Sequence, residues 1–388
     1  MSISIDKILK QAINYHKSGN LYEATKLYKS IIAINPNNAL VQNNLGSIYE
    51  LSDEFDIAAK CYKNAILYNK DYALALNNLG AVLQKVKNYN EAKFYYNKAL
   101  KIKPDLKSSL LGLGQIYVIE NDYEKALKYF DQCNNELSRP RSLVCLYHLK
   151  RYEEIYDRIR ANINIDRLNL RIAAFCCFLE SEQKKDTENT FCKRPLEYIY
   201  YSNLSKHTCD LNLFINNITK ELNRIETIWE PSTKTTKKGF QSKYNLFNTD
   251  LAGIEELKSI ILKEIDLYYL KYKNDDSLFI KEWPKIKNLV GWHVVLKQQG
   301  YQDTHNHPGG WLSGVIYLKV IDHDNKNSGA IEFSLNGENF FNKKAPSKIH
   351  KPELGDIILF PSSLYHKTIP FSLNTERIII SFDLMPSI

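Results

Sequence analysis

The feature that most constrains this 388-residue chain is an internal repeat of 34 residues in its first half. Small, aliphatic and aromatic residues recur at this spacing, and about four units fill residues 5–138. A fixed period of this length indicates stacked repeats rather than one closed core. The recurring positions are Gly46, Gly80 and Gly114; Leu45, Leu79 and Leu113; Phe55, Tyr89 and Tyr123; and Ala58, Ala92 and Ala126.

Each unit predicts a pair of helices. In residues 73–106, apolar side chains recur at intervals of three and four, the turn signal "KNY" divides the segment, and Pro104 closes it. Gly80 and Ala92 are small where the two helices must approach closely. Because one such pair cannot cover its own apolar face, the units must stack on one another. The first half is therefore predicted to be an all-α solenoid.

These positions make the first half similar to the tetratricopeptide repeat family. The resemblance implies a module that binds a protein or peptide along a groove. Asn44 and Asn78 precede the leucine-glycine pairs and resemble the ladder of amides by which some repeat proteins hold a peptide backbone, since an amide both donates and accepts. The matching positions in the flanking units are Lys10 and Gly112, so the ladder is incomplete. The alternative is that both amides solvate the groove or bond the next helix.

The period of the sequence changes in the second half. Residues 139–204 keep helical spacing without the repeat register, and we predict a helical cap and linker there. Beyond a further helical stretch at 254–272, short segments rich in β-branched and aromatic residues predict strands, so 205–388 is expected to be an α+β domain with a sandwich or barrel. The strand segments are "NLVGWHVVLKQ", "WLSGVIYLKV", "GAIEFSL", "GDIILFPS" and "ERIIISFDL".

The segment "HNHPGGW" carries two histidines, His305 and His307, one residue apart. In an extended backbone both imidazoles project from the same side, and two neutral nitrogens aimed at one point suit Fe(II), Zn or Cu. By itself such a pair is more often an exposed loop. His366, which follows "GDIILFPSSLY", would bring a third imidazole from distant sequence to the same place.

Arg377 begins the otherwise apolar strand "RIIISF". Strand alternation places Arg377 on one face with Ile379 and Ser381. If this face points inward, the guanidinium needs a carboxylate, because a buried unpaired charge is costly. An anionic cosubstrate would supply that carboxylate.

These histidine and arginine segments together resemble the Fe(II)/2-oxoglutarate-dependent oxygenases, and more narrowly the family in which such a domain follows tetratricopeptide repeats. The resemblance runs from about residue 229 to 386 and implies a double-stranded β-helix, a jelly-roll fold shared with the cupins. It implies that the catalytic iron is held by three ligands, which are His305, His307 and His366.

The same resemblance implies that Arg377 pairs with the distal carboxylate of 2-oxoglutarate. Tyr317, on the strand after the two histidines, is a further candidate for a hydrogen bond to that cosubstrate. Cupins also combine H-x-H with a later histidine. Arg377 favours the oxygenase, because a cupin that works without 2-oxoglutarate would not need it.

His307 departs from the wider oxygenase pattern, in which the iron is held by two histidines and one carboxylate. Three interpretations stay open: a working three-histidine iron site, which we favour; a site completed by Asp303 or Glu332; or a site that has lost iron. His293 is interpreted as a structural residue, because it lies one strand earlier and has no partner in sequence.

Composition excludes several classes of protein. A net charge of +8 with 25% charged residues is ordinary, and the lysine-bearing segment 232–243 has no aromatic interleaving, so we expect a solvated loop there rather than a nucleic-acid site. The longest apolar run, 172–179, is far shorter than the ~20 residues that cross a bilayer, and the N-terminus lacks an apolar signal core. Seven cysteines without C-x-x-C spacing indicate a reducing compartment.

We therefore predict a cytoplasmic Fe(II)- and 2-oxoglutarate-dependent hydroxylase that acts on a protein or peptide recruited by its repeats. The alternatives are a non-catalytic interaction protein with a degenerate barrel, and a cupin-like metal enzyme that does not use 2-oxoglutarate.

Overall fold

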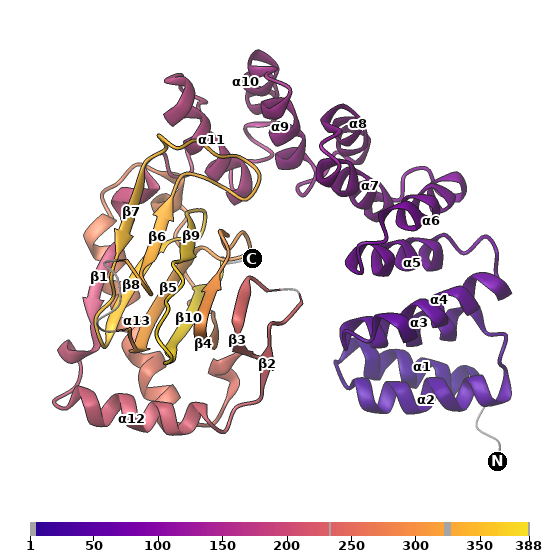
Figure 1. The fold of residues 1–388 in the computed structure, drawn as a ribbon, viewed down its shortest axis with the longest axis horizontal. Coiled ribbons are helices and arrows are strands. Elements are labelled where there is room, and N and C mark those ends of the chain that lie inside the picture. Colours follow the sequence, from indigo (N-terminus) through magenta and orange to yellow (C-terminus); the bar gives the residue numbers. More distant parts are fainter. Residues whose placement is uncertain (1–4, 233, 322–326, 387–388) are drawn as a thin grey trace. The chain divides into compact units, whose positions relative to one another are not determined.

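The computed structural model describes residues 5–232, 234–321 and 327–386. The chain divides into two compact units, Met1–Tyr152 and Glu153–Ile388. The first unit is built of helices, and the second contains antiparallel sheets with helices (Figure 1). This confirms the predicted fold class, an all-α solenoid followed by a β-rich α+β region. In the described part of the chain, no helix is both long enough and apolar enough to span a membrane.

The first unit consists of antiparallel helix pairs that stack along the chain, as the 34-residue period predicts (Figure 1). Each helix is short because a turn or cap residue ends it after about four turns of backbone. The helices are α1 (Ile5–Lys17), α2 (Leu21–Ile34), α3 (Ala39–Leu51), α4 (Phe55–Tyr68), α5 (Ala73–Lys85), α6 (Tyr89–Ile102), α7 (Lys107–Ile119), α8 (Tyr123–Cys133) and α9 (Arg139–His148).

Side-chain size explains the repeated glycine and aromatic positions. A Cβ on Gly80 of α5 would lie 2.9 Å from the ring of Tyr96 on α6, so only glycine lets the ring pack flat against the neighbouring helix. Buried polar bonds add to this packing between consecutive units. Asn78 of α5 donates to Asn43 of α3 at 3.1 Å, and Ser109 of α7 donates to the side chain of Asn77 at 2.9 Å.

The second unit is built from two antiparallel sheets, one of seven strands in the order β1-β8-β5-β10-β4-β3-β2 and one of three in the order β7-β6-β9. The strands are β1 (Tyr200–Asn203), β2 (Thr227–Trp229), β3 (Thr236–Ser242), β4 (Leu289–Gln302), β5 (Leu312–Lys319), β6 (Ile331–Ser334), β7 (Ser347–His350), β8 (Asp356–Pro361), β9 (Tyr365–Thr368) and β10 (Arg377–Leu384).

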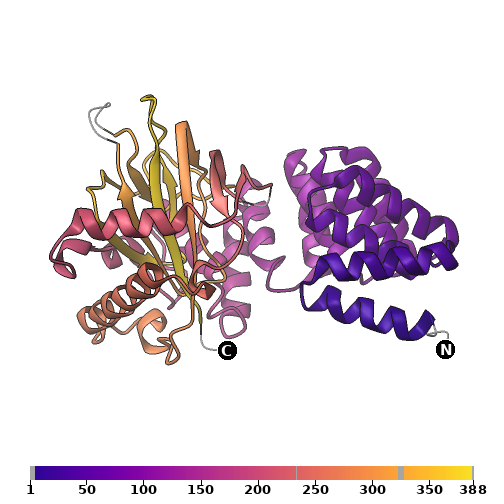
Figure 2. The ribbon, with the colours of Figure 1, turned by 90° about the horizontal axis from the view of Figure 1, so that it is seen from below.

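Helices cover one face of the larger sheet. Two of them are α12 (Leu211–Leu222), which runs across the direction of the strands in Figure 2, and α13 (Ala252–Tyr272). The remaining helical elements are α10 (Tyr152–Asn162), α11 (Leu170–Gln183), α14 (Leu278–Lys281) and the short 3-10 turns Pro195–Tyr198, Leu204–Lys206 and Leu246–Asn248.

Alternation along the strands separates two apolar clusters. On β10, Ile380 and Phe382 belong to the helix-side cluster, whereas Ile379 belongs to the inter-sheet cluster with Tyr317 of β5 and Phe333 of β6. The predicted face assignment of the strand after Arg377 therefore holds in the structure. Side chains on the inter-sheet face are enclosed by both sheets.

The predicted linker 139–204 is divided between the two units. Helix α9 packs against α8, whereas α11 contributes Leu170 and Ala173 to the helix-side cluster, and β1 pairs with β8 as an edge strand. The structure thus places β1 in the sheet and not in a helical linker. Helical spacing shows which face of a segment is buried but not which neighbour covers it, and a four-residue edge strand carries too short a pattern to detect.

The lysine-bearing segment 232–243 is not simply a loop, because most of it forms strand β3. Gly239 lies so close to β4 that an added Cβ would meet the backbone oxygen of Val295 at 2.7 Å, and Thr236 and Gln241 are buried. The lysines of the segment, among them the exposed Lys234 and Lys238, gave it the polar character of a solvated loop.

A buried carboxylate joins α13 to the edge strand β1. Glu264 is 1% exposed and accepts hydrogen bonds from Tyr200 at 2.9 Å and Ser202 at 2.7 Å. The Nε2 atom of His207 lies 2.6 Å from the same carboxylate. Sequence patterning gave no sign of this cluster, since its members are up to 64 residues apart.

Replacing Glu264 with alanine is expected to destabilise the second unit by about 3 kcal/mol, because one buried and two partly buried polar groups lose their acceptor. All four tryptophans lie in this unit, so urea unfolding followed by tryptophan fluorescence measures it separately. The matched control is Glu256→Ala, which removes an exposed carboxylate from the same helix and should change the free energy of unfolding by less than about 0.5 kcal/mol. Equal losses in both variants would contradict the role given to Glu264.

His293 on β4 predicts an acid-sensitive fold. The side chain is 3% exposed, and burial lowers its pKa from 6.5 to about 4. As the pH falls, the unfolded chain takes up this proton first, so stability that is full above pH 6.5 is lost between about 6.5 and 4. The loss is about 3 kcal/mol.

We expect urea unfolding at pH 7.5 and pH 4 to show a smaller pH-dependent loss in His293→Gln than in the wild-type protein, by about that amount. An identical pH dependence in the two proteins would rule out His293 as its source.

Candidate metal centre

The structure brings the three predicted histidines together. One side-chain nitrogen from each of His305, His307 and His366 lies within 4.8 Å of the others. The backbone sets this arrangement, because His305 and His366 exchange two hydrogen bonds, N to O at 3.0 Å and 2.9 Å, as an isolated antiparallel bridge. The H-x-H segment therefore runs beside β9, and the alternation within it turns both of its imidazoles to the same side.

Each imidazole is oriented by an acceptor at its Nδ1 atom. The Nδ1 of His305 lies 2.6 Å from the carbonyl oxygen of Asp303, and that of His366 lies 3.2 Å from the carbonyl oxygen of Leu364. A carbonyl oxygen only accepts, so Nδ1 carries the proton in both rings. The unprotonated Nε2 atoms are then the nitrogens available to a metal.

His307 is oriented by a carboxylate instead of a carbonyl. Its Nδ1 lies 2.7 Å and 3.0 Å from the two carboxylate oxygens of Asp383 on β10. Asp383 in turn accepts a hydrogen bond from Ser313 at 2.6 Å. Our sequence reasoning missed Asp383, although strand alternation from Arg377 places position 383 on the same face and could have identified it.

The Pro-Gly-Gly bend allows the chain to pass close to this carboxylate. A Cβ on Gly310 would lie 2.8 Å from the hydroxyl of Ser362 and 3.0 Å from the carboxyl carbon of Asp383. The amide of Gly310 donates to the carbonyl oxygen of His307 at 2.9 Å, which closes the turn before β5 begins. Glycine is required here by close approach rather than by an unusual backbone angle.

Two of the rings are held neutral by their surroundings. Burial, and then the proximity of His307, lower the pKa of His305 to about 3. Burial also holds the pKa of His366 well below its ordinary value. Aromatic rings close the site, with Phe360 at 4.7 Å from His366 and Trp292 at 5.5 Å from His307 between ring centroids. Neutral imidazoles are the form that binds a metal.

Arg377 is buried on the inter-sheet face of β10, as the sequence predicts. It is 1% exposed, its guanidinium carbon lies 4.9 Å from the ring centroid of Tyr317, and its Nη1 donates to Thr368 at 3.1 Å. Burial lowers the pKa of this guanidinium. Within the described residues no carboxylate pairs with it, and neither its Nε nor the Tyr317 hydroxyl has a hydrogen-bond partner.

The guanidinium and the imidazoles face one apolar cluster. Phe333 and Phe360, which pack against His366, belong to the inter-sheet cluster that also contains Tyr317. A charged group in such surroundings, with donors left over, fits a small anion.

The other candidate carboxylates lie elsewhere. Glu332 on β6 forms an ion pair with Lys367 at 3.1 Å, and the side chain of Asp303 is exposed while its backbone oxygen accepts from His305. In the described residues, neither joins the cluster of potential ligands.

The two amides considered for peptide binding contact neighbouring side chains in the first unit. Asn44 donates to the hydroxyl of Tyr28 at 3.3 Å, and Asn78 donates to Asn43 at 3.1 Å. These contacts agree with the alternative interpretation, in which the amides bond the adjacent helix. Peptide binding by Asn44 and Asn78 stays a prediction.

The two units match different known families. Residues 39–72 and 71–133 match tetratricopeptide repeat models, and residues 291–383 match the family described as "Putative 2OG-Fe(II) oxygenase". The last range includes all three histidines, Arg377 and Asp383. The chain thus combines tetratricopeptide repeats with a domain of this oxygenase family, which confirms the resemblance seen in the sequence.

Two solved structures with which the chain shares similarity have low TM-scores. A crystal structure of MamA is 23% identical, covering 39% of this chain and 81% of that chain with a TM-score of 0.32. The Pseudomonas aeruginosa PilF structure is 20% identical, covering 42% of this chain and 76% of that one with a TM-score of 0.38. At these scores they add nothing to the fold assignment. No curated protein matches the chain in sequence.

Asp383→Asn is expected to weaken metal binding by roughly 10- to 100-fold, because it keeps an oxygen near His307 but removes the negative charge. Titration of the metal-free protein with Co(II), followed by its visible absorption, measures this affinity without any turnover. His366→Ala, which removes one of the three clustered imidazoles, should abolish the band. If Asp383→Asn binds Co(II) as tightly as the wild-type protein, the carboxylate has no role in the site.

Proposed function

We propose that the second unit is an Fe(II)- and 2-oxoglutarate-dependent oxygenase that hydroxylates a C–H bond of a protein or peptide. The observation that carries the proposal is the convergence of three imidazoles in a domain that also buries a guanidinium, for which the described residues supply no carboxylate partner. The first group of residues suits a divalent transition metal, and the second suits a dicarboxylate. The match to the oxygenase family supports the same pairing.

His305, His307 and His366 would hold the iron through their Nε2 atoms. When bound, Fe(II) with 2-oxoglutarate and O₂ supplies the oxidising chemistry, in which one oxygen atom enters the substrate and the oxoacid leaves as succinate and CO₂. With only three protein ligands, such an ion would keep coordination positions for small-molecule ligands. The carbonyl and carboxylate acceptors at Nδ1 keep each ring in the ligand orientation.

Arg377 would bind the distal carboxylate of 2-oxoglutarate in a bidentate contact. Its position is fixed by Thr368 at one nitrogen and by the ring of Tyr317 beneath it. The free hydroxyl of Tyr317 would donate to the same carboxylate. The apolar inter-sheet cluster around them excludes water, which strengthens both interactions.

Asp383 supports the interpretation of a working site with histidine in place of the usual carboxylate. A carboxylate at Nδ1 makes the Nε2 atom of an imidazole a stronger metal ligand. Asp383 also supplies, next to His307, the negative charge that a carboxylate ligand would have carried. A degenerate site would have no need of this buried carboxylate, which is held by Ser313 as well as His307.

The repeats would recruit the substrate and raise its local concentration at the oxygenase domain. This part of the proposal relies on the binding role that tetratricopeptide repeats have in general. No residue of the chain identifies the substrate. The cytoplasmic location likewise stays a prediction from composition.

Arg377→Met tests the proposal. We expect the concentration of 2-oxoglutarate needed for half-maximal succinate release to rise at least about 100-fold, because a buried, charge-assisted pair is lost. Co(II) binding to the metal-free variant should be unchanged. Lys319→Met is the matched control, since it removes a cation at an exposed position of neighbouring β5 and should leave both measurements near wild type.

Three outcomes separate the alternatives. Succinate release that survives Arg377→Met unchanged would rule out the assigned cosubstrate site. Metal-dependent activity without any requirement for 2-oxoglutarate would indicate a cupin-like enzyme. If wild-type protein binds no Fe(II) and develops no visible band with Fe(II) and 2-oxoglutarate under anaerobic conditions, the chain is a non-catalytic interaction protein.

A further inference from the structure

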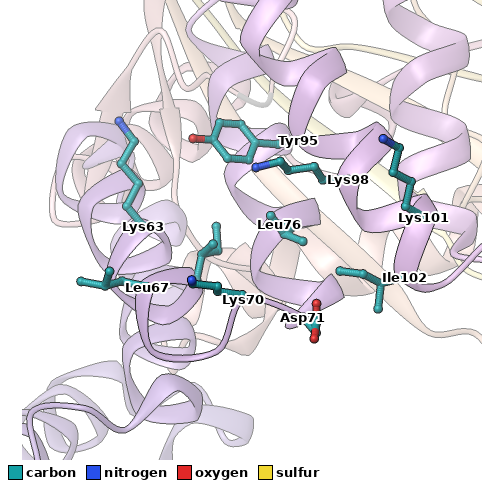
Figure 3. A pocket seen from close by; sticks show the side chains of 10 residues that line it. Lys63, Leu67, Lys70, Asp71, Leu76, Tyr95, Lys98, Lys101 and Ile102 are labelled. Atoms are coloured by element: carbon teal, nitrogen blue, oxygen red, sulfur yellow. The ribbon is translucent and has the colours of Figure 1, made fainter.

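A groove of about 560 Å³ lies in the first unit where the ends of α4 and α6 meet the start of α5 (Figure 3). α4 and α6 are the second helices of two consecutive repeat pairs, whereas the asparagines considered for peptide binding lie on first helices. Neither Asn44 nor Asn78 lines the groove. The groove is therefore separate from the surface that the resemblance to repeat proteins implies.

The groove has an apolar floor and apolar edges. Leu76 is 1% exposed and closes the floor between α4 and α6, with Tyr95 beside it. Two large apolar side chains remain open to solvent at the edges, Leu67 at 66% and Ile102 at 40% exposure. Their exposure leaves apolar surface that a bound side chain would cover, at roughly 25 cal/mol per Å² removed from water.

Four lysines surround this apolar surface, with a single acid, Asp71, among the lining residues. In Figure 3 Lys70 lies near Leu76, while Lys63, Lys98 and Lys101 stand at the side away from Asp71. No ion pair is formed by any of the four lysines within the described residues. The ammonium of Lys98 lies over the ring of Phe94 at 4.4 Å, a contact that leaves its charge unneutralised.

The cluster of four lysines occurs where α4, α5 and α6 meet and is not a general property of the repeats. The position of Lys70 carries proline one period before and after, and only Lys63 has a lysine at either neighbouring position. The equivalents are Pro36 and Pro104 for Lys70, Asn64 and Gln132 for Lys98, Leu67 and Asn135 for Lys101, and Lys29 and Asn97 for Lys63. A solvated helix face would not concentrate lysines at one junction of the solenoid.

We propose that this groove binds an acidic segment of a partner protein, in which one or two aliphatic side chains lie next to several carboxylates. The aliphatic side chains cover Leu67, Leu76 and Ile102, and the carboxylates meet the lysines at the rim. This occupant matches both properties of the groove, charge and apolar surface. The proposal does not rest on the oxygenase activity, since every residue involved belongs to the first unit.

A nucleic acid fits the groove less well. The lining contains no arginine, which pairs with phosphates through two hydrogen bonds, and its exposed edges are leucine and isoleucine, which give a phosphate backbone nothing to contact. An ammonium is a compact charge that serves a carboxylate equally well. The aliphatic edges therefore favour a peptide.

The test uses a displayed library of random dodecapeptides selected against the full-length protein. We expect the enriched sequences to carry Asp or Glu beside Leu, Ile or Val. The strongest is then synthesised with a fluorescent label, and its Kd is measured by anisotropy at 50 mM and 300 mM salt. Binding should weaken at the higher salt concentration, because the lysines are exposed and their charges are screened.

Two groove variants test the two parts of the contact. Lys98→Glu with Lys101→Glu should weaken binding at least about tenfold, since two attractions become repulsions. Leu67→Ser should weaken it about fivefold through lost apolar contact. The matched control reverses two exposed lysines outside the groove, Lys26→Glu with Lys128→Glu, and should change the Kd less than about twofold. Circular dichroism melting should match wild type in each variant.

Several results would overturn the proposal. These are a library that enriches no acidic sequence, an acidic peptide that binds the Lys98→Glu, Lys101→Glu protein as tightly as wild type, and an oligouridylate that binds in a groove-dependent way while the peptide does not. A dimer in light scattering that the same variants dissociate would assign the groove to a second copy of the chain instead. Peptide binding that both groove variants weaken and the control does not supports the proposal.

Discussion

The arrangement of the second unit depends on the fixed register of strand β10. It lies in the middle of the larger sheet, hydrogen-bonded to β4 on one side and β5 on the other, so its register is fixed from both edges. Ile380 and Phe382 face the helices, while Arg377 and Asp383 face the smaller sheet with opposite charges at the two ends of one strand. A slip of one residue would exchange the two faces, turn both charges toward the apolar helix-side cluster and separate Asp383 from His307.

Much of the fold could be predicted because it follows from local patterns. The spacing of Gly80 and its equivalents reflects close packing within each helix pair, and such packing recurs wherever the period does. Segments whose neighbours come from distant sequence were predicted less well. Strand β3 contains Lys237 and Lys238 and resembles a loop in sequence, because the strand with which it pairs, β4, comes from a distant segment. Strand β1 has only four residues with which to signal its place at a sheet edge.

The residues of the site, too, could be predicted only in part from the sequence. The three histidines and Arg377 could be predicted because their residue types are unusual at those positions and strand alternation shows where they point. The acceptors that orient the rings could not, since two of them are backbone oxygens whose positions depend on the folded path of the chain. Asp383 is an intermediate case. Alternation identifies its face, but only the folded structure shows that His307 lies 2.7 Å away.

The Asp383–His307 contact has a consequence for the charge of the whole cavity. Iron held by three neutral imidazoles would keep both of its positive charges, and the guanidinium of Arg377 adds a third. The two carboxylates of the oxoacid and the one of Asp383 would balance them, so the filled interior would be electrically neutral although no carboxylate of the described residues joins the cluster of potential ligands. A low-dielectric interior tolerates such a set of charges only when they cancel. In this arrangement the protein carboxylate would contact the imidazole of His307 instead of the metal itself.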